Sequence, residues 1–521
     1  MAGSIGEVKD SNDKAKVPRD NPCGNELQRS QTLDNGDVMT ADDPSRHNPE
    51  TPRRQFSFIS LAGIGLVVGN TWPALGGSIL TSIYNGGAPG VLYEFIAASL
   101  CYFTIAATLS ELASALPSSS GVYLWASVTP GEKRGRMLGY FAVQGSRANE
   151  FRRFGNLCVQ MYAFQHPDFE PHAWHVFICF LIITWLACGI VCLWNSIVPH
   201  LNVAGMALII LGALATIAVC AAKTRTGPGS ASNKTVWKDW SADIGYPDGF
   251  VFIAGMLNAS YAMGAADAVS HLAEEIPDPA KNVPRAIGMQ YLLGFVTGFA
   301  YLVAILYAIT DYDAVFASGF PIGEIYAQAT RRSAGAIGLL VLILLPTLLS
   351  TVGCFVTCGR TLWTLARDGA APFPAALGRI HPGFGVPLAA TLTTGVFVML
   401  LGVIYLGSST AFNAFVGTYV LLSTASYMAA TLPYVVRRRD PGFARGAFYM
   451  RGLFGWVVVA WASLYMPVWF VVYCFPYALP TDAQSMNYSV LIWGGLTIFV
   501  AIWWVVVARH RCVKPTPRIT W

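Results

Sequence analysis

The sequence predicts an all-α polytopic membrane protein, and two features of the chain support this fold class. Of its 521 residues, 54% are hydrophobic and only 12% are charged, whereas a soluble protein is usually about one-quarter charged. Apolar runs long enough to cross a bilayer as helices also recur along most of the chain. Sparse charge and long apolar runs together indicate a chain that crosses the membrane many times.

Eleven apolar runs have the length of a membrane-spanning helix. They lie at 57–83, 90–115, 174–194, 201–222, 250–272, 286–310, 335–358, 386–406, 411–435, 453–475 and 488–508.

The polar part of the chain excludes several classes of protein. Residues 1–55 have mixed charge and many Pro, Asn and Asp, and they lack the apolar core of a signal peptide. We interpret them as a disordered cytosolic tail. The net charge of +5 is too small to indicate nucleic-acid binding. The cysteines include no CxxC motif, and we interpret the pair Cys354 and Cys358 as buried thiols, so no metal or cofactor is predicted.

The stretch VQGSRANEFRRFG, residues 143–155, is polar and lies between the second and third apolar runs. If 138–163 nevertheless crosses the membrane and the N-terminus is cytosolic, the inside loops hold nineteen Lys and Arg and the outside loops six. Without that crossing, every later loop would change sides, against the positive-inside rule. The charge pattern therefore predicts a twelfth span here and places both termini in the cytosol.

The charges within this stretch make such a span costly. Each Arg near a bilayer centre costs roughly 2.5–3.5 kcal/mol on insertion scales. Burial inside a helix bundle can offset part of this cost if Glu150 pairs with Arg153 or Arg147.

Two N-glycosylation sequons support the same topology. Asn233 (NKT) and Asn487 (NYS) both fall in loops that the twelve-span arrangement places outside. Both are candidate glycosylation sites.

The first and sixth apolar runs are the best candidates for interrupted helices. In the first run, Gly63, Gly65 and Gly69 are followed directly by Asn70. The sixth run contains small and polar residues within its apolar stretch, namely Gly255, Asn258, Ser260, Gly264 and Asp267. Paired interruptions of this kind, five spans apart, are typical of transporters built from inverted repeats, where the breaks hold the substrate. Each glycine by itself could equally serve close helix packing.

Asp267 is a carboxylate within the sixth span, and an ionisable residue at such a position indicates function. We consider it a candidate for proton coupling. A structural hydrogen bond near the cytosolic end of the span is the alternative interpretation.

Three motifs identify a related family. SELASALPSSSGVYLWA (110–126), DAVSHLAEEIPDPAKNVPRAI (267–287) and GRTLWTLARDGAAPF (359–373) resemble the amino acid–polyamine–organocation permeases. PGVLYEFIAAS, DWSADIGYPDGFVF, TAFNAFVG and FPYALPTDAQSMNY are similar to the fungal choline and amino-acid branch of these permeases. The likeness covers about 56–509.

The resemblance implies a twelve-helix carrier with a five-plus-five inverted repeat and two further C-terminal helices. The implied parts are a first repeat at 56–222, an extracellular loop at 223–249, a second repeat at 250–435, helices 11 and 12 at 436–508, and a cytosolic tail at 509–521.

The resemblance also implies where the substrate is held, between the breaks of the first and sixth helices. The residues implied on the first helix are Gly63, Ile64 and Gly65, followed by Asn70 and Trp72. Those implied on the sixth helix are Asn258, Ala259, Ser260 and Tyr261.

Two pairs in the cytosolic motifs are expected to act in gating or in loop structure. These are Glu275 with Arg285 and Arg367 with Asp368. Solvated loop charges that orient the protein are the alternative interpretation.

The chain departs from the family at the third helix. After LGYFA the family continues with an apolar helix, whereas this chain has the polar stretch at 143–155 before NLCVQMYAFQHPDF resumes the likeness. A local splice or frame error would explain the departure. A real but degenerate third helix, at about 138–163, is the other explanation.

The expected function is import of choline or a related small organic cation or amine across the plasma membrane, coupled to an ion such as the proton. A quaternary ammonium is recognised by aromatic faces, and Trp72 and Tyr261 lie close to the two breaks. An amino-acid permease, for example for γ-aminobutyrate, is the alternative, because a carboxylate would suit N–H groups exposed at 63–65. A non-transporting receptor, or an inactive product of the altered third helix, also stays open. No enzymatic activity is expected.

Overall fold

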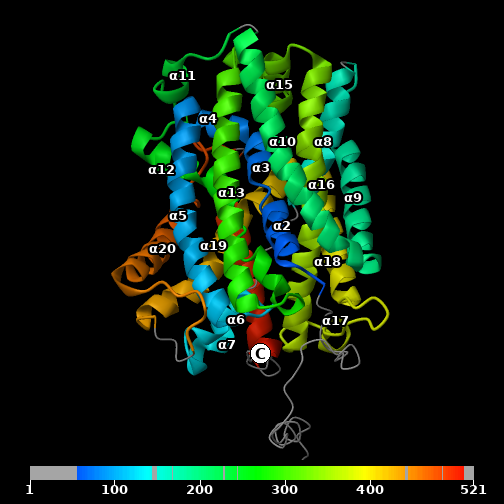
Figure 1. Cartoon of the computed structure of the whole chain (residues 1–521), viewed down its shortest axis with the longest axis vertical. Helices are drawn as coiled ribbons and strands as arrows, with labels where there is room; N and C mark the ends of the chain where they lie inside the picture. Colours follow the sequence, from blue (N-terminus) through cyan, green and yellow to red (C-terminus); the bar gives the residue numbers. More distant parts are fainter. Residues whose placement is uncertain are drawn as a thin grey trace, which may run out of the picture. The chain divides into compact units, whose positions relative to one another are not determined.

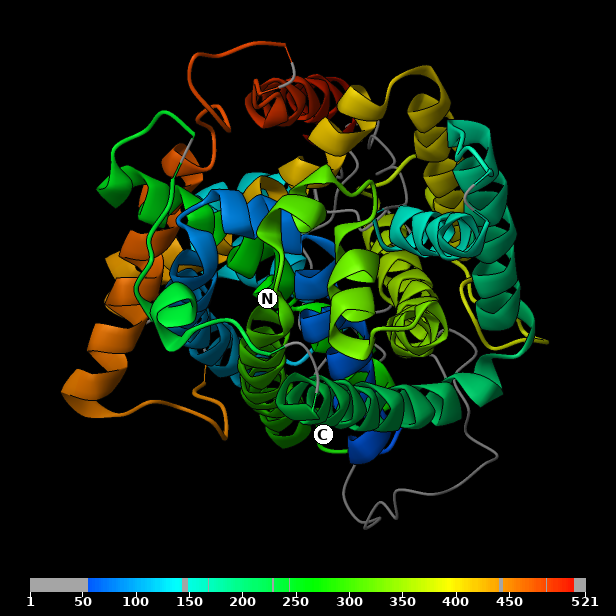
Figure 2. The same ribbon diagram turned by 90° about the horizontal axis from the view of Figure 1, so that it is seen from above.

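The computed structural model describes residues 55–142, 149–166, 168–226, 229–242, 244–439, 444–483 and 485–509. Throughout these residues the secondary structure is helical, apart from two isolated β-bridges. Figure 1 shows the long helices running along the vertical axis, and Figure 2 looks along the bundle. The tails predicted at 1–55 and 509–521 lie outside the described residues, except for Gln55 and Arg509.

Among the described residues, eleven helices are long and apolar enough to cross a membrane, and they coincide with the eleven predicted runs. Nine of them have no long interruption: α5 (Gly87–Ala115), α9 (Ala173–Leu193), α10 (Val198–Thr226), α13 (Pro279–Ala308), α16 (Ser333–Arg367), α18 (Leu388–Gly407), α19 (Ser409–Val436), α20 (Gly452–Val472) and α21 (Ser489–Trp503). Short helices lie in the connections between spans: α4 (Ile79–Tyr84), α6 (Val122–Val128), η2 (Asn195–Ile197), α11 (Asn233–Trp237), α14 (Tyr312–Ala317), α15 (Pro321–Thr330) and α17 (Pro374–Leu377). The π-helical turn η4 (Trp504–Ala508) continues α21 and belongs to the last span.

Much of the polar stretch forms a helix. Helices α7 (Glu132–Phe141) and α8 (Asn149–Gln165) lie on either side of 143–148, which are outside the described residues. Helix α8 packs against α9 and α16. Its Phe151 is buried, with the ring centroid 5.2 Å from that of Phe355 on α16. Within the predicted twelfth span, the described residues 138–141 and 149–163 are therefore helical, although α8 is too polar to count among the eleven apolar helices.

The first span is broken at Asn70. Helix α2 (Phe58–Gly69) ends there, and α3 (Thr71–Gly77) begins directly after it. Asn70 has a left-handed backbone with φ of 44°, a conformation that asparagine tolerates better than most residues. Pro73 has no N–H to donate to the carbonyl group four residues earlier, which removes one helical hydrogen bond and favours a break at this point. The break thus lies one to two turns beyond the predicted 63–65.

The sixth span is broken after Met263. Helix α12 (Asp248–Met263) ends at this residue, and the chain resumes as the 3-10 helix η3 (Ala268–Glu275) after a short turn around Gly264. The implied site at 258–261 lies on the last turns of α12, before the break. Both spans predicted to be interrupted are therefore interrupted, and each break lies after the substrate residues implied on that helix.

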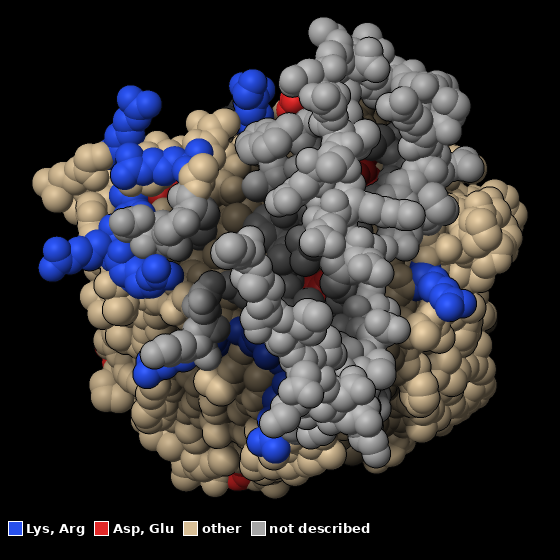
Figure 3. All heavy atoms as spheres, turned by 90° about the horizontal axis from the view of Figure 1, so that it is seen from below, with Lys and Arg blue, Asp and Glu red and all other residues tan. Residues whose placement is uncertain are grey.

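Positive side chains gather at one end of the bundle. Figure 3 views this end from below and shows Lys and Arg side chains around its rim. In Figure 1 the short helices α6, α7 and α17 lie at the same end, whereas α11 and α15 lie at the other. The predicted cytosolic loops include the connections that contain α6, α7 and α17.

The two sequons differ in accessibility. Asn233 is exposed at the start of α11, and its side-chain oxygen accepts a hydrogen bond from the Tyr307 hydroxyl at 2.8 Å. Asn487 is only 2% exposed, and its amide nitrogen donates to the carbonyl oxygens of Tyr473 (2.7 Å) and Phe475 (3.0 Å). A glycan would be attached through that same nitrogen, so the prediction for Asn487 is corrected.

We therefore expect glycosylation at Asn233 alone. In a eukaryotic host, Asn233→Gln should abolish the shift in electrophoretic mobility produced by an endoglycosidase, and the matched Asn487→Gln should leave it unchanged. A shift that persists in Asn233→Gln, or no shift in the parent chain, would contradict this expectation.

Candidate functional site

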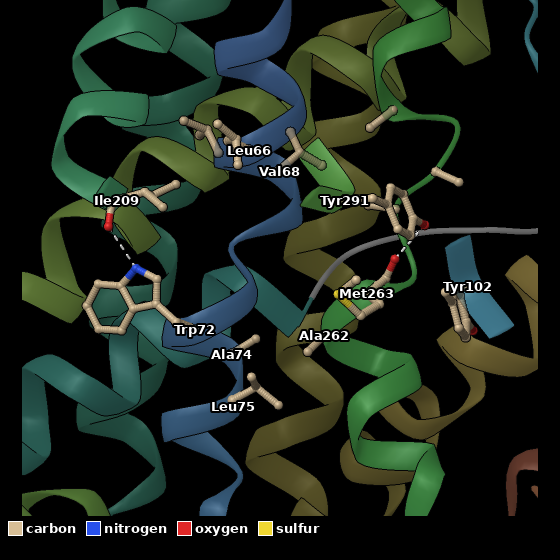
Figure 4. Close-up of a cluster of buried hydrophobic side chains, with 14 of the residues drawn as sticks. Leu66, Val68, Trp72, Ala74, Leu75, Tyr102, Ile209, Ala262, Met263 and Tyr291 are labelled. Carbon is tan, nitrogen blue, oxygen red and sulfur yellow. Dashed lines mark hydrogen bonds between the residues drawn. The ribbon is translucent and has the colours of Figure 1, made fainter. Parts of the chain in front are cut away.

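The carbonyl groups freed by the break in the sixth span are bonded to side chains of the neighbouring helix α13. The Tyr291 hydroxyl donates to the Met263 carbonyl oxygen at 2.6 Å, as Figure 4 shows. The Gln290 amide nitrogen donates to the Ala265 carbonyl oxygen at 3.1 Å. An unpaired carbonyl inside a membrane is costly, so these two bonds hold the break open without leaving it unsatisfied.

Side chains of two other helices also contact the carbonyl groups at this break. From α19, the Tyr419 hydroxyl donates to the Gly264 carbonyl oxygen at 2.9 Å, and the Tyr427 hydroxyl, whose shorter contact is with Asp267, lies 3.2 Å from the same oxygen. From α3, the Thr71 hydroxyl donates to the Ala262 carbonyl oxygen at 3.4 Å. The Thr71 bond joins the breaks of the first and sixth spans directly.

Asn70 links the first break to two further helices. It is fully buried, and its amide nitrogen lies 3.3 Å from a carboxylate oxygen of Glu150 on α8 and 3.4 Å from the Thr347 hydroxyl on α16. Among the described residues its side-chain oxygen accepts no hydrogen bond. Such a buried acceptor is available to a donor from a ligand or water.

Glu150 is the acidic residue that lies at both breaks. It is 4% exposed. Besides Asn70, it receives a hydrogen bond from the Tyr261 hydroxyl of α12 at 3.4 Å and an ion pair from Arg153 at 3.3 Å. Because Glu150 is in the first turn of α8, the positive end of that helix dipole also stabilises its charge. Three helices therefore converge on one buried carboxylate.

The two arginines beside Glu150 lie over aromatic rings. The guanidinium of Arg153 is 5.6 Å from the ring centroid of Tyr261. That of Arg152 is 5.1 Å from Tyr405 and 5.4 Å from Phe412. Distances of this size are those of cation–π contacts, so the aromatic faces in this region do accommodate positive charge.

Of the two predicted aromatic residues, only Tyr261 is at the site. Its ring is 5.9 Å from that of Tyr419, edge to face. Trp72 is fully buried and points the other way: its ring nitrogen donates to the Ile209 carbonyl oxygen at 3.0 Å, and its ring packs 5.0 Å from Tyr301. Figure 4 shows the Trp72 ring directed toward Ile209, on the side of the first span away from Met263 and Tyr291. Trp72 therefore packs in the core and not at the candidate site.

The implied residues on the first helix serve helix packing. A Cβ atom at Gly63 would lie 2.6 Å from the backbone oxygen of Asn202 on α10, and one at Gly65 would lie 2.8 Å from Val269 on η3. Ile64 between them is fully buried. Only small residues allow helices to approach this closely, and α2 is unbroken at all three positions.

The polar residues implied at the site on the sixth helix form hydrogen bonds with side chains away from the break. Asn258 donates to the Ser82 hydroxyl on α4. Ser260 lies 2.6 Å from the Tyr473 hydroxyl and 3.4 Å from that of Tyr465 on α20. Ala259 is buried in the core. Of the four residues implied at 258–261, Tyr261 alone contacts the buried carboxylate.

Asp267 lies just past the break in the sixth span, within a group of polar side chains. One carboxylate oxygen accepts from the Tyr427 hydroxyl at 2.7 Å, and the other lies 3.4 Å from the His271 ring nitrogen. The other ring nitrogen of His271 lies 3.0 Å from the Ser119 carbonyl oxygen. The Asp267 side chain is 28% exposed, so it is not sealed within the bundle.

The charged pairs near the end of η3 differ from those expected. Glu275 pairs with Arg360 of α16 at 2.6 Å, both side chains being 1% exposed, instead of with Arg285. Arg367 does approach Asp368, at 3.8 Å, but its shorter contact is with Glu274 at 3.1 Å. Both arginines belong to α16, so these pairs tie the second half of the sixth span to that helix.

Sequence reasoning noted the charges of α8 but did not assign them to the site. The signal was present, because an ionisable residue inside a membrane span indicates function whether or not the span itself resembles the family. Glu150 and Arg153 are the residues that this rule would have added.

Comparison with known proteins places the chain in a family. A family model described as amino acid permease matches residues 56–496. The chain is 30% identical over 466 residues to a choline transporter of Saccharomyces cerevisiae, covering 87% of this chain and 81% of that one. It is 29% identical over 472 residues to a swainsonine transporter of Arthroderma benhamiae, covering 88% and 92%.

The fold is also similar to that of a solved transporter. A manganese transporter of Eremococcus coleocola superposes with a TM-score of 0.54 at 14% identity, covering 87% of this chain and 95% of that one. The matched family and these relatives are transporters, not enzymes. The chain therefore belongs to the amino acid permease family and is a membrane transporter of this type.

Proposed function

We propose that the protein is a secondary active transporter that imports choline or a related small organic cation across the plasma membrane. The observation that carries this proposal is the Glu150 carboxylate, buried where the breaks of the first and sixth spans meet. A buried carboxylate beside an aromatic ring attracts a cation and disfavours an anion.

The chemistry of choline suits these groups. A quaternary ammonium has no N–H to donate, so it binds through charge and through aromatic faces. Glu150 supplies the charge and Tyr261 the ring, with Tyr419 packed edge to face against it. The choline hydroxyl can donate to the side-chain oxygen of Asn70, which accepts no hydrogen bond from the residues that the structure describes. The 30% identity to a choline transporter supports the same substrate class.

Coupling to the proton gradient is the second part of the proposal. Asp267 is a partly exposed carboxylate beside the break, and a ring nitrogen of His271 lies 3.4 Å from it. Such carboxylate and histidine pairs within a membrane carry protons in many transporters. The excess of Lys and Arg in the loops at one end supports an orientation with both termini in the cytosol.

An amino-acid substrate is the second candidate, and Arg153 favours it. A zwitterion could place its ammonium group on Glu150 and its carboxylate on the Arg153 guanidinium, which lies only 3.3 Å from Glu150. Arginine binds carboxylates with two parallel hydrogen bonds. The two candidates differ in whether the guanidinium contacts the substrate.

Neutralising Glu150 is expected to abolish most of the transport. In yeast cells that lack their own choline uptake, Glu150→Gln should lower the uptake of labelled choline at least about tenfold, which corresponds to roughly 1.4 kcal/mol of lost binding. The matched control is Glu170→Gln, because Glu170 is an exposed acidic residue in the loop before α9. Strong inhibition by amino acids and none by choline analogues would reject choline in favour of the second candidate.

Asp267 should matter more for accumulation than for exchange. In proteoliposomes Asp267→Asn should lower proton-driven uptake while leaving counterflow of labelled substrate largely intact, because exchange needs no net proton movement. Tyr427→Phe serves as the control, since it removes the 2.7 Å hydrogen bond and keeps the carboxylate. Equal loss of both activities in Asp267→Asn would show that Asp267 has a structural role.

A further inference from the structure

A positive side chain already lies where a cationic substrate is expected. The Arg153 guanidinium is 3.3 Å from Glu150 and 5.6 Å from the centre of the Tyr261 ring. The Arg153 and Glu150 side chains are 9% and 5% exposed. The charge of Glu150 is therefore balanced by a side chain of the same helix.

The groups around Arg153 are those of a preformed binding site for a cation. Glu150 comes from α8, Asn70 from the break of the first span and Tyr261 from the end of α12. They offer a carboxylate, an amide oxygen with no hydrogen bond from the described residues, and an aromatic face. The arginine stem runs past α3, with its Nε 3.5 Å from the position that a Cβ atom of Gly77 would take.

The neighbouring Arg152 provides an internal comparison. It is on the same helix, and its guanidinium lies over Tyr405 and Phe412, which belong to α18 and α19. The Arg152 guanidinium thus contacts rings of α18 and α19, whereas that of Arg153 pairs with the Glu150 carboxylate, which joins the two breaks. The two adjacent arginines consequently differ in the site they occupy.

We propose that Glu150, Asn70 and Tyr261 form a cation subsite that Arg153 occupies in this conformation, and that the positive group of the substrate binds by taking the place of Arg153. A second cation cannot join Arg153 at one carboxylate without unfavourable repulsion at close range. Arg153 is then a tethered competitor that determines which cations bind. The identity of the substrate rests on the proposed function, but the occupancy of the subsite does not.

Affinity for substrate follows from this competition. A ligand that binds only when Arg153 has left shows an apparent dissociation constant raised by the reciprocal of the fraction of open sites. If Arg153 fills the subsite about nine-tenths of the time, its removal lowers that constant about tenfold.

Chemical rescue tests the subsite without any transport assay. Purified full-length Arg153→Ala should be stabilised against heat by millimolar guanidinium chloride, compared with the same concentration of sodium chloride, because free guanidinium refills the vacated subsite. The parent chain and Arg152→Ala should show no such stabilisation. Adding Glu150→Gln to Arg153→Ala should remove it. Equal shifts in all variants, or no shift in Arg153→Ala, would overturn the proposal.

Equilibrium binding of labelled choline provides the second measurement. Arg153→Met, which keeps an apolar side chain beside α3 if the alanine variant does not fold, should bind choline about tenfold more tightly than the parent chain. Binding no tighter than the parent's would overturn the tethered competitor and leave the proposed function standing. Rescue by guanidinium with no choline binding in any variant would instead support the subsite and reject choline as the substrate.

Discussion

The site depends on one electrostatic constraint, which is that a carboxylate buried within a membrane bundle needs both a counter-charge and hydrogen bonds. Glu150 meets this requirement with Arg153 on its own helix, with Asn70 at the break of the first span and with Tyr261 on the sixth. The same contacts hold α8 against the broken spans. The polar stretch that disrupts the apolar pattern of the third span thus contains the buried carboxylate that contacts both broken spans.

A second constraint shapes the protein around this carboxylate. Breaking a helix inside a membrane frees carbonyl groups that water cannot reach, and each must find a donor. At the sixth span Tyr291 and Gln290 of α13 and the tyrosines of α19 provide these donors. The breaks are therefore fixed by their neighbours, and movement of α13 or α19 would alter the bonds at the breaks.

The sequence predicted the spans well and the orientation of side chains poorly. Hydropathy placed all eleven apolar helices, and loop charge indicated the helical segment in which α8 is found. Membrane helices are apolar on most sides, so periodicity does not reveal which face meets the site. For this reason the sequence predicts Trp72 at the substrate site, whereas the structure places it in the core. The break fell at Asn70, not at 63–65, because glycine there serves close packing with α10 and η3. The sequence also could not predict that Glu275 pairs with Arg360, because the two residues are far apart in the chain.

The central claim is that Glu150 is the counter-ion of a transported cation, and a structure of the purified chain with choline bound tests it most directly. The account predicts density for the ammonium group beside Glu150 and within about 6 Å of the Tyr261 ring, with the Arg153 side chain moved away. Choline bound elsewhere in the bundle, or Arg153 still paired with Glu150 while choline is present, would contradict the account.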